Sequence, residues 1–264
     1  MFTFLLSMKK PQTIVQVGAW LGDDSLINAC RRFGHHLYMF EPNPARVKEL
    51  EAKAAGAATI HVIPMAVSSY NGKATFNIAA HDDCSSLQNF DAGANANWVH
   101  EWHPYKNFEM VDRFEVDVIR LDTFFGRNGI EVIDLLEIDA QGEDLRVVEG
   151  LGERIRDVKK IQIEVNISGK PLYDNSFTRD EAVSFFTSHG FERHISWKQC
   201  LNREENVVFR NKLHYPNALI NAVSAGMEQR SRAAYFAAVK LPRVLAVTGM
   251  MMRQKFSRQH QESI

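Results

Sequence analysis

The sequence has few of the features that mark secreted, membrane or nucleic-acid-binding proteins. Only three cysteines occur in 264 residues, at Cys30, Cys84 and Cys200, and none forms a CxxC pair. This odd, scattered set argues against a disulfide framework or a zinc site and is typical of a reduced, cytoplasmic protein. The apolar start, residues 1–6, has no basic region before it and no small-residue cleavage site, so it does not resemble a signal peptide.

Long unbroken apolar runs are also missing. The most apolar late stretch, residues 235–252, is interrupted by Lys240, Pro242 and Arg243. Charges near the centre of a membrane span are strongly disfavoured, so we expect no transmembrane helix. The composition, with 45% hydrophobic and 24% charged residues, is that of a globular protein and excludes a collagen-like or disordered chain.

The net charge is only -1, but the two signs are unevenly distributed. From Arg210 to Ile264 there are nine Lys or Arg and two Asp or Glu, whereas residues 1–209 contain 22 basic and 30 acidic residues. The sequence therefore predicts an acidic domain over residues 1–214 and a basic helical tail over 215–264. The tail is expected to pack on the body or on a second copy, or to lie against an anionic surface. Without an aromatic-interleaved basic motif, nucleic acid is not expected as a partner.

Strand and helix patterns alternate at the beginning of the chain. Short apolar runs predict strands, and polar-flanked periodic segments between them predict helices. The order is strand 13–17, helix 25–30, strand 37–40, helix 44–54 and strand 60–63. This β-α-β-α-β order predicts a parallel sheet with right-handed crossovers.

A long β-rich insertion is predicted after the third strand, and the alternation then resumes. The expected strands of the insertion cover 73–78 and 115–119. Further strands are expected at 133–138, 161–165, 191–197 and 206–209, with helices at 143–151 and 178–188. The main sheet then has seven strands.

Two glycines follow the first strand, in the segment VGAWLGDDS at residues 17–25. Ligands of open α/β sheets bind beyond the carboxyl ends of the strands, and Glu41 ends the second strand, where a carboxylate can accept hydrogen bonds from ribose hydroxyls. The Gly-x-x-x-Gly spacing lacks the tighter pattern that holds a pyrophosphate, and Asp23 and Asp24 would repel phosphate. A nucleoside without phosphate fits better, and S-adenosylmethionine is the common one. The alternative is a plain tight turn beside an unrelated glutamate.

A wider set of segments resembles the FkbM-type methyltransferase family. They follow the family order over residues 13–210: VGAWLGDDS (17–25), FEPNP (40–44), PMAVSSYNGKATFNI (64–78), SSL (85–87), VIRLDTFF (118–125), LLEIDAQGEDLRVVEGL (135–151), IQIEV (161–165) and GF (190–191). The resemblance implies an S-adenosylmethionine-dependent methyltransferase with a Rossmann-like seven-stranded sheet, helices on both faces and the last strand antiparallel. It also implies methyl transfer, most often to a hydroxyl of a sugar, glycan or natural-product acceptor.

The resemblance also implies a set of cofactor-binding residues. The glycine turn would line the methionine part, Glu41 would bind the ribose, residues 65–68 would flank the adenine, and Asp139 would lie near the methionine end and the acceptor. The complete expected set is Gly18, Ala19, Trp20, Gly22, Ser25, Glu41, Pro42, Ala66 and Asp139.

Three positions depart from the family pattern. Gln16 stands where the family usually has an acid, two positions before the first motif glycine, and Trp20 replaces a commonly small polar residue. Glu137 stands where the family tends to have lysine. The family acid commonly anchors the cofactor's amino group indirectly, so we expect weaker cofactor binding here or substitution by Asp23 or Asp24.

Methyl transfer to a hydroxyl requires a general base within hydrogen-bond reach. Asp139 and Glu164 end adjacent predicted strands, so both carboxylates should face one cleft and handle the acceptor. His81 is a further candidate base from the long loop, ahead of His100 and His103. The alternatives are that the carboxylates position the cofactor or cap helices, and that the histidines are ordinary loop residues.

Two further interpretations concern a metal and a lid. Asp139, Glu164 and Asn166 offer three oxygens suited to a hard divalent cation such as magnesium, although no spacing demands one. The loop from His81 to Phe108 carries four aromatic residues that either close over the acceptor or pack on the domain itself: Trp98, Trp102, Tyr105 and Phe108.

Two other function classes compete with an enzyme of this kind. A non-catalytic nucleoside-binding scaffold or partner subunit would explain the departures at Gln16 and Trp20. An NAD-dependent oxidoreductase would need a glycine turn that can hold the pyrophosphate of the dinucleotide, and the Gly-x-x-x-Gly spacing does not provide one.

Overall fold

The computed structural model describes residues 10–98, 107–199, 203–217 and 225–230. The chain divides into two compact units, residues 1–218 and 219–264. Of the second unit only residues 225–230 are described, and they are helical. The domain boundary at residue 214 and the role of the basic tail therefore stay predictions.

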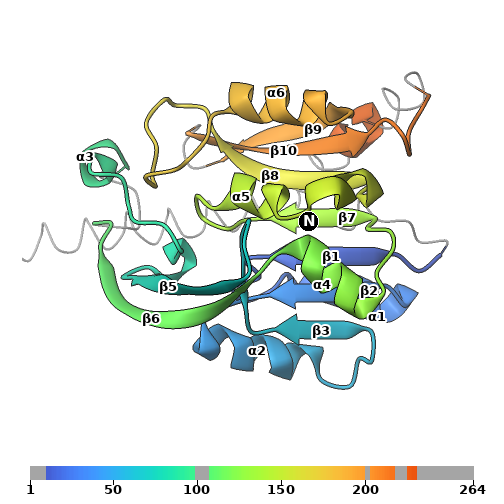
Figure 1. The fold of residues 1–264 in the computed structure, drawn as a ribbon, viewed down its shortest axis with the longest axis horizontal. Coiled ribbons are helices and arrows are strands. Elements are labelled where there is room, and N and C mark those ends of the chain that lie inside the picture. Colours follow the sequence, from blue (N-terminus) through green and yellow to red (C-terminus); the bar gives the residue numbers. More distant parts are fainter. Residues whose placement is uncertain (1–9, 99–106, 200–202, 218–224, 231–264) are drawn as a thin grey trace, which may run out of the picture. The chain divides into compact units, whose positions relative to one another are not determined.

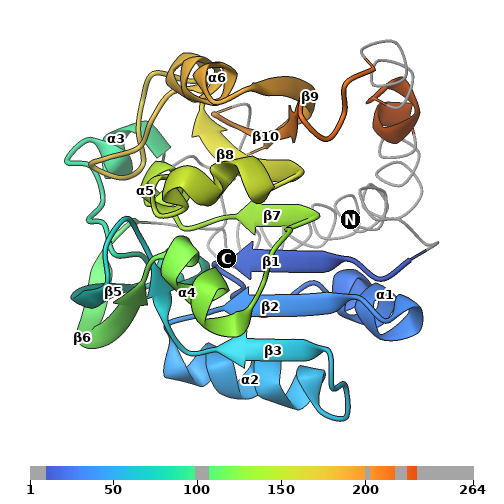
Figure 2. The same ribbon diagram turned by 45° about the vertical axis from the view of Figure 1, so that its right-hand side comes forward.

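A seven-stranded sheet forms the first unit, with the order β3-β2-β1-β7-β8-β10-β9. Figure 2 shows β3, β2, β1 and β7 side by side in this order. Strand β10 runs antiparallel to both of its neighbours, and the other pairs are parallel. The strands are β1 (Thr13–Val17), β2 (His36–Phe40), β3 (Ile60–Ile63), β7 (Leu135–Ile138), β8 (Lys160–Asn166), β9 (Phe191–Gln199) and β10 (Glu204–Asn211). The predicted Rossmann-like α/β fold is confirmed.

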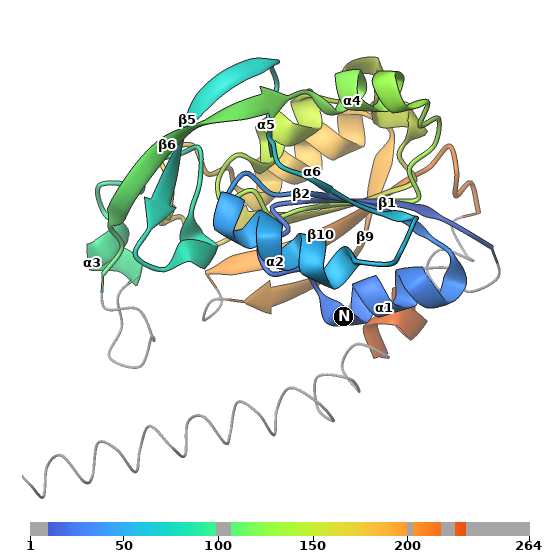
Figure 3. The same cartoon turned by 90° about the horizontal axis from the view of Figure 1, so that it is seen from below.

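Helices cover both faces of this sheet (Figure 3). One face carries α4 (Leu121–Asn128), α5 (Asp144–Glu149) and α6 (Arg179–Ser188), whereas α1 (Asp24–Phe33) and α2 (Pro44–Ala54) lie on the other. Because helices cover both faces, the side chains on both faces of β7 and most of β1 and β8 are buried. A short 3₁₀ segment, Gly152–Asp157, follows α5.

The main hydrophobic core lies between the sheet and α4, α5 and α6. Phe186 of α6 stacks on Phe209 of β10 with ring centroids 4.3 Å apart, and both side chains are buried. Truncating a buried aromatic of this kind costs about 3–5 kcal/mol. The sequence patterns do not predict α4, yet Leu121, Phe124 and Phe125 share its buried face.

Local sequence signals set the ends of the helices. The side chain of Asp23 accepts hydrogen bonds from the backbone N–H groups of Ser25 and Leu26 and so caps α1, which ends at Gly34 in a left-handed conformation. Thr178 and Glu181 form a capping box at the start of α6.

The segment between β3 and β7 contains a second, three-stranded sheet with the order β4-β6-β5 (Figure 1). Its strands are β4 (Ala66–Val67), β5 (Gly72–Ala79) and β6 (Met110–Ile119), and β5 pairs antiparallel with β6. The segment also contains a 3₁₀ helix, η2 (Asp82–Cys84), and a short helix, α3 (Ala94–Trp98). This second sheet lies beyond the carboxyl ends of the first strands of the chain, where it can border a site.

The aromatic residues of the long loop that are described pack inside the protein. Trp98 is buried, donates a hydrogen bond from Nε1 to the Lys170 carbonyl at 3.1 Å, and packs edge-on against Phe108 in a cluster with Tyr173. Of the two interpretations of the loop, packing on the domain therefore holds for Trp98 and Phe108. His100, Trp102, His103 and Tyr105 lie outside the described residues.

None of the helices within the described ranges has the length and hydropathy needed to cross a membrane.

Candidate functional site

The glycine turn after β1 presses directly against the end of β7. Gly18 has a φ of +75°, and a Cβ atom added to it would stand 1.9 Å from the backbone oxygen of Asp139. The N–H groups of Gly18 and Ala19 both donate to the carbonyl of Phe40, at 3.1 and 3.0 Å. Only glycine fits position 18 in this conformation. The turn therefore joins the carboxyl ends of β1, β2 and β7 at one place.

The second glycine of the turn has a packing role. A Cβ atom at Gly22 would stand 2.9 Å from Leu50 Cδ2 and 3.0 Å from Ile27 Cδ1. Gly22 thus allows α1 and α2 to approach each other on one side of the sheet. Its expected contact with a cofactor stays a prediction, as does that of Ser25, whose hydroxyl and N–H both donate to Asp23 in the cap of α1.

Glu41 braces the turn from the end of β2. Its Oε2 accepts the N–H of Trp20 at 2.7 Å, and its Oε1 accepts the N–H of Asn43 at 2.8 Å. The residue is only 5% exposed, and burial raises the pKa of its carboxyl group although both hydrogen bonds oppose this. Each oxygen retains a second lone pair, so the predicted ribose contact is chemically open to it.

Trp20 connects the turn to the insertion. It is 39% exposed, has a positive φ of 46°, and donates from Nε1 to Asp82 Oδ2 at 3.3 Å. Arg46 of α2 makes an ion pair with the same carboxylate. A non-glycine residue with positive φ is strained, and such strain is concentrated at functional sites.

Two further predicted cofactor residues are Pro42 and Ala66. Pro42 follows Glu41 and is half-buried. Ala66 is buried in β4, and its side chain belongs to the small core of the insertion with Phe76, Val116 and Val118. A contact of Ala66 with adenine would therefore have to use its backbone.

A row of buried polar side chains crosses the sheet beneath the turn. Gln16 of β1 is the register partner of Glu137 of β7 and donates from Nε2 to Glu137 Oε2 at 3.2 Å. Gln162 of β8 lies at 3.5 Å from the other oxygen of Glu137 and, on its far side, at 3.5 Å from Asn206 of β10. Burial, and secondly the charge of Asp139, holds the pKa of Glu137 well above its usual range.

The turn after β7, residues 139–144, is a second strained connection. Gln141 has a φ of 53°, and a Cβ at Gly142 would stand 2.7 Å from Tyr173 Cβ. Gln141 Nε2 donates to Asp139 Oδ1, while the Tyr173 hydroxyl lies 2.6 Å from Gln141 Oε1 and 2.9 Å from the Cys84 carbonyl. Sequence reasoning missed the roles of Gln141 and Tyr173. The QG pair that begins two residues after Asp139 was the available signal.

Glu143 ties this turn to the insertion and was also missed. It is almost fully buried, and its carboxylate accepts the hydroxyl of Ser68 at 2.6 Å and the side-chain amide of Gln88. The side chain of Ser86 adds a hydrogen bond to the Gln141 carbonyl at 2.6 Å. The insertion is thereby fixed against the carboxyl edge of the main sheet.

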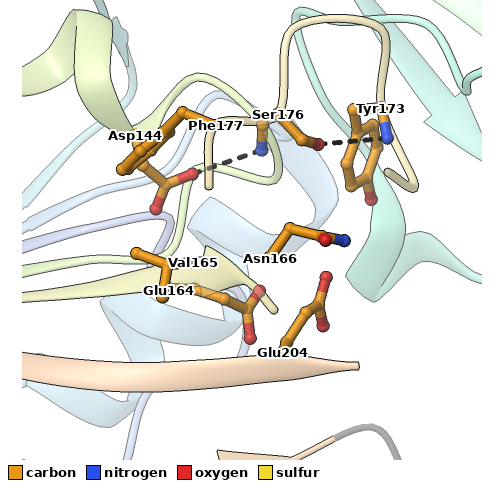
Figure 4. Close-up of a pocket in the computed structure, with 9 residues that line it drawn as sticks. Asp144, Glu164, Val165, Asn166, Tyr173, Ser176, Phe177 and Glu204 are labelled. Carbon is orange, nitrogen blue, oxygen red and sulfur yellow. Dashed lines mark hydrogen bonds between the residues drawn. The ribbon is translucent and has the colours of Figure 1, made fainter. Parts of the chain in front are cut away.

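A small pocket, partly open to solvent, lies beyond the carboxyl end of β8 (Figure 4). Glu164 and Asn166 of β8 line it together with Glu204 of β10, Asp144 of α5 and Tyr173. Burial, followed by the charge of Asp139, raises the pKa of Asp144 to about 7. Burial, and then the charges of Glu204 and Asp139, raises the pKa of Glu164 well above its usual range. The two carboxylates predicted to handle the acceptor, Asp139 and Glu164, thus act on each other electrostatically.

Asp139 differs from its neighbours because its side chain is exposed. Desolvation by the surrounding protein nevertheless raises its pKa, while the hydrogen bond from Gln141 lowers it. It is thus an accessible carboxylate beside the glycine turn.

The sequence model of the "Methyltransferase FkbM domain" family matches residues 16–193. The chain belongs to this family. The matched range begins at Gln16 and contains the glycine turn, Glu41, Asp139 and Glu164, and it ends before Glu204. The predicted FkbM membership is confirmed, and no curated protein matches the chain.

Solved structures with similar folds include other methyltransferases. The METTL16 MTase domain has a TM-score of 0.45 and 5% identity over 79% of this chain and 64% of that chain. Aeropyrum pernix fibrillarin, solved with natively bound S-adenosyl-L-methionine, has a TM-score of 0.44 and 10% identity over 77% and 68%. An rRNA methylase from Streptococcus thermophilus has a TM-score of 0.41 and 11% identity, over 79% of this chain and 92% of that chain. This chain spans less than two thirds of the METTL16 domain, and these likenesses concern the fold alone.

Two other predicted site residues of this FkbM domain are His81 and Asn166. His81 is half-buried directly before η2 and is not among the residues that line the pocket. Asn166 lines the pocket, but its amide is engaged in its own loop, since Nδ2 donates to the Lys170 carbonyl at 2.8 Å and Oδ1 accepts the N–H of Gly169 at 3.0 Å. In the part of the chain that is described, no cluster of three or more His, Cys, Asp or Glu side chains is arranged to hold a metal ion.

Proposed function

We propose that this FkbM-family protein is an S-adenosylmethionine-dependent methyltransferase that methylates a hydroxyl group of a sugar, glycan or natural-product acceptor. The observation that carries the proposal is the contact of Gly18 with the backbone of Asp139. This contact brings the glycine turn beside an accessible carboxylate. Cofactor and base would then meet at one strand edge.

The residues at this edge fit the cofactor. A cationic sulfonium favours surrounding carboxylates, and Glu41 and Asp139 flank the turn, whereas a phosphate-rich dinucleotide would be repelled. The Gly18 cradle and the carboxylate of Glu41 would hold the methionine and ribose parts. Bound S-adenosylmethionine supplies a methyl group on a positively charged sulfur.

The chain's own groups orient the acceptor and take its proton. Asp139 would accept the hydroxyl proton on a carboxylate oxygen as the new O–CH3 bond forms, the S–CH3 bond breaks and S-adenosylhomocysteine leaves. A raised pKa suits this role, because a base works best when its pKa approaches the working pH. Glu164 would position the acceptor from the neighbouring strand. His81 remains a second candidate base.

The test is a transfer assay with methyl-labelled S-adenosylmethionine and a panel of hydroxyl-bearing and amine-bearing acceptors. We expect S-adenosylhomocysteine to bind by calorimetry and the label to appear as an O-methyl group by NMR. NAD should not bind. Cofactor binding without turnover on any acceptor would favour the scaffold alternative, and an N-methyl product would contradict hydroxyl methylation.

A further inference from the structure

The pocket beyond β8 is acidic in a way that the methyl-transfer proposal does not require. Asp144, Glu164 and Glu204 place three carboxyl groups around it, and none of the described residues that line it is basic. Figure 4 shows Glu164 and Glu204 lying near each other at one side of the pocket. Such a lining disfavours an acceptor that presents phosphate or carboxylate there.

Strand register brings the two glutamates together. Glu164 lies opposite Asn206 and Glu204 lies opposite Asn166 in the antiparallel pair of β8 and β10, so the two are diagonal neighbours on the same face. Their carboxyl groups lie near each other in the pocket (Figure 4), and burial together with the charge of Glu204 raises the pKa of Glu164. Two carboxyl groups in this contact must share a proton or bind a cation, because both cannot be ionised side by side at low cost.

Glu164 also has an unused acceptor. Its Oε1 is buried and has no hydrogen-bond partner. A buried acceptor without a donor is costly, and a ligand N–H group would satisfy it. The hydroxyl of Tyr173 already contacts Gln141 and Cys84, so Tyr173 leaves this oxygen to a ligand.

The pocket lies on the acceptor side of the sheet. Strands β8 and β10 are the first and second neighbours of β7 on the side away from β1, whereas the glycine turn lies on β1 and β2. The acidic lining is therefore displaced from the place proposed for the sulfonium. A cation bound there would therefore be separate from the sulfonium.

We infer that this pocket binds a protonated amino group of the methyl acceptor, held between Glu164 and Glu204. The positive charge of an ammonium group offsets the repulsion between the two carboxyl groups. Its N–H groups also donate to Glu164 Oε1, which has no other partner. A neutral polyol brings donors but no charge. The inference rests on the proposed function, since it names the class of acceptor: an amine that also carries the hydroxyl to be methylated.

The experiment measures binding to the full chain by calorimetry at pH 7.5, with ethanolamine as the probe and ethylene glycol as its neutral counterpart. We expect saturable binding of ethanolamine that weakens at least tenfold in Glu164→Gln and in Glu204→Gln, and no saturable binding of ethylene glycol. Glu51→Gln, an exposed position on α2, removes the same charge elsewhere and should bind ethanolamine as the wild type does.

Equal binding of the two probes, no binding of ethanolamine, or binding that survives both pocket substitutions would overturn the inference. S-adenosylhomocysteine is titrated into the same samples, and its retained binding shows that the variants are folded. Loss of ethanolamine binding alone contradicts the amine pocket. Failure of wild-type protein to bind S-adenosylhomocysteine, with ethanolamine binding intact, contradicts the methyltransferase proposal instead.

Discussion

Gln16 and Glu137 lie directly opposite each other on the parallel strands β1 and β7 and share a hydrogen bond of 3.2 Å. These are the two positions at which the family usually has an acid and tends to have a lysine. The departures at these two positions are therefore coupled. In this chain the carboxylate is Glu137 on β7 rather than an acid on β1, and its partner on β1 is the uncharged amide of Gln16. Both side chains are buried, so the pair must stay matched.

The coupling predicts a strong effect of changing one partner alone. Gln16→Glu would place a second carboxyl group against the buried Glu137, and we expect a loss of about 3–5 kcal/mol in the free energy of unfolding. Adding Glu137→Lys should recover at least about 1 kcal/mol of this loss by restoring opposite charges. Urea unfolding of the two single variants and the double variant measures the coupling, and strictly additive effects would contradict it.

The contact of Gly18 with Asp139 predicts that this glycine cannot be replaced. Gly18→Ala should cost about 3 kcal/mol or more and abolish S-adenosylhomocysteine binding, because the new Cβ meets a backbone oxygen. Gly129→Ala is the matched control, since Gly129 has a φ of +62° but nothing within 4 Å of the added atom. There we expect only the conformational cost of about 1–2 kcal/mol. If thermal unfolding shows similar losses of stability in Gly18→Ala and Gly129→Ala, the contact of Gly18 with Asp139 does not explain the effect.

Asp144 predicts a pH dependence of stability with a definite sign. The pKa of this carboxyl group is about 7 in the folded chain and about 4 when unfolded, so the folded state binds more protons between these values. Stability from this group therefore falls as the pH rises from about 4 to 7 and then levels off. Asp144→Asn should match the wild type near pH 4 and exceed it by about 1–4 kcal/mol at pH 8.

The control for this measurement is Asp112→Asn, at an exposed position on β6. Chemical denaturation at both pH values should show the same stability difference for this variant at pH 4 and pH 8. If Asp144→Asn behaves in the same way, the buried carboxyl group does not govern the pH dependence.

Gln141 predicts a change in the pH profile of catalysis. Its hydrogen bond lowers the pKa of Asp139, so Gln141→Met should raise that pKa. The acid limb of the kcat profile should then move to higher pH, while the affinity for S-adenosylhomocysteine stays within about twofold. A purely structural role of Gln141 would lower kcat at every pH without moving the limb.

Local sequence patterns predicted the strands and helices well, but they did not predict the contacts between side chains that lie far apart in the sequence. The strands 13–17 and 60–63 and the helix 44–54 coincide with β1, β3 and α2, because period and caps are local properties. The family resemblance pointed to Asp139, and the ends of two adjacent predicted strands pointed to Asp139 and Glu164. The bond of Gln16 to Glu137 joins residues 121 positions apart and depends on strand order, and the pairing of Glu164 with Glu204 depends on an antiparallel register. Neither contact can be predicted from a short segment of the sequence.

The position of β10 has a consequence for synthesis of the chain. This strand lies between β8 and β9 although both precede it in sequence, so β9 cannot join the sheet until β10 has been made. The two strands must add to β8 as a hairpin late in folding. Glu204 begins that last strand. A nascent chain still held in the ribosome tunnel at this point has its glycine turn but lacks Glu204, so the pocket beyond β8 is complete only after the last strand of the domain has been released.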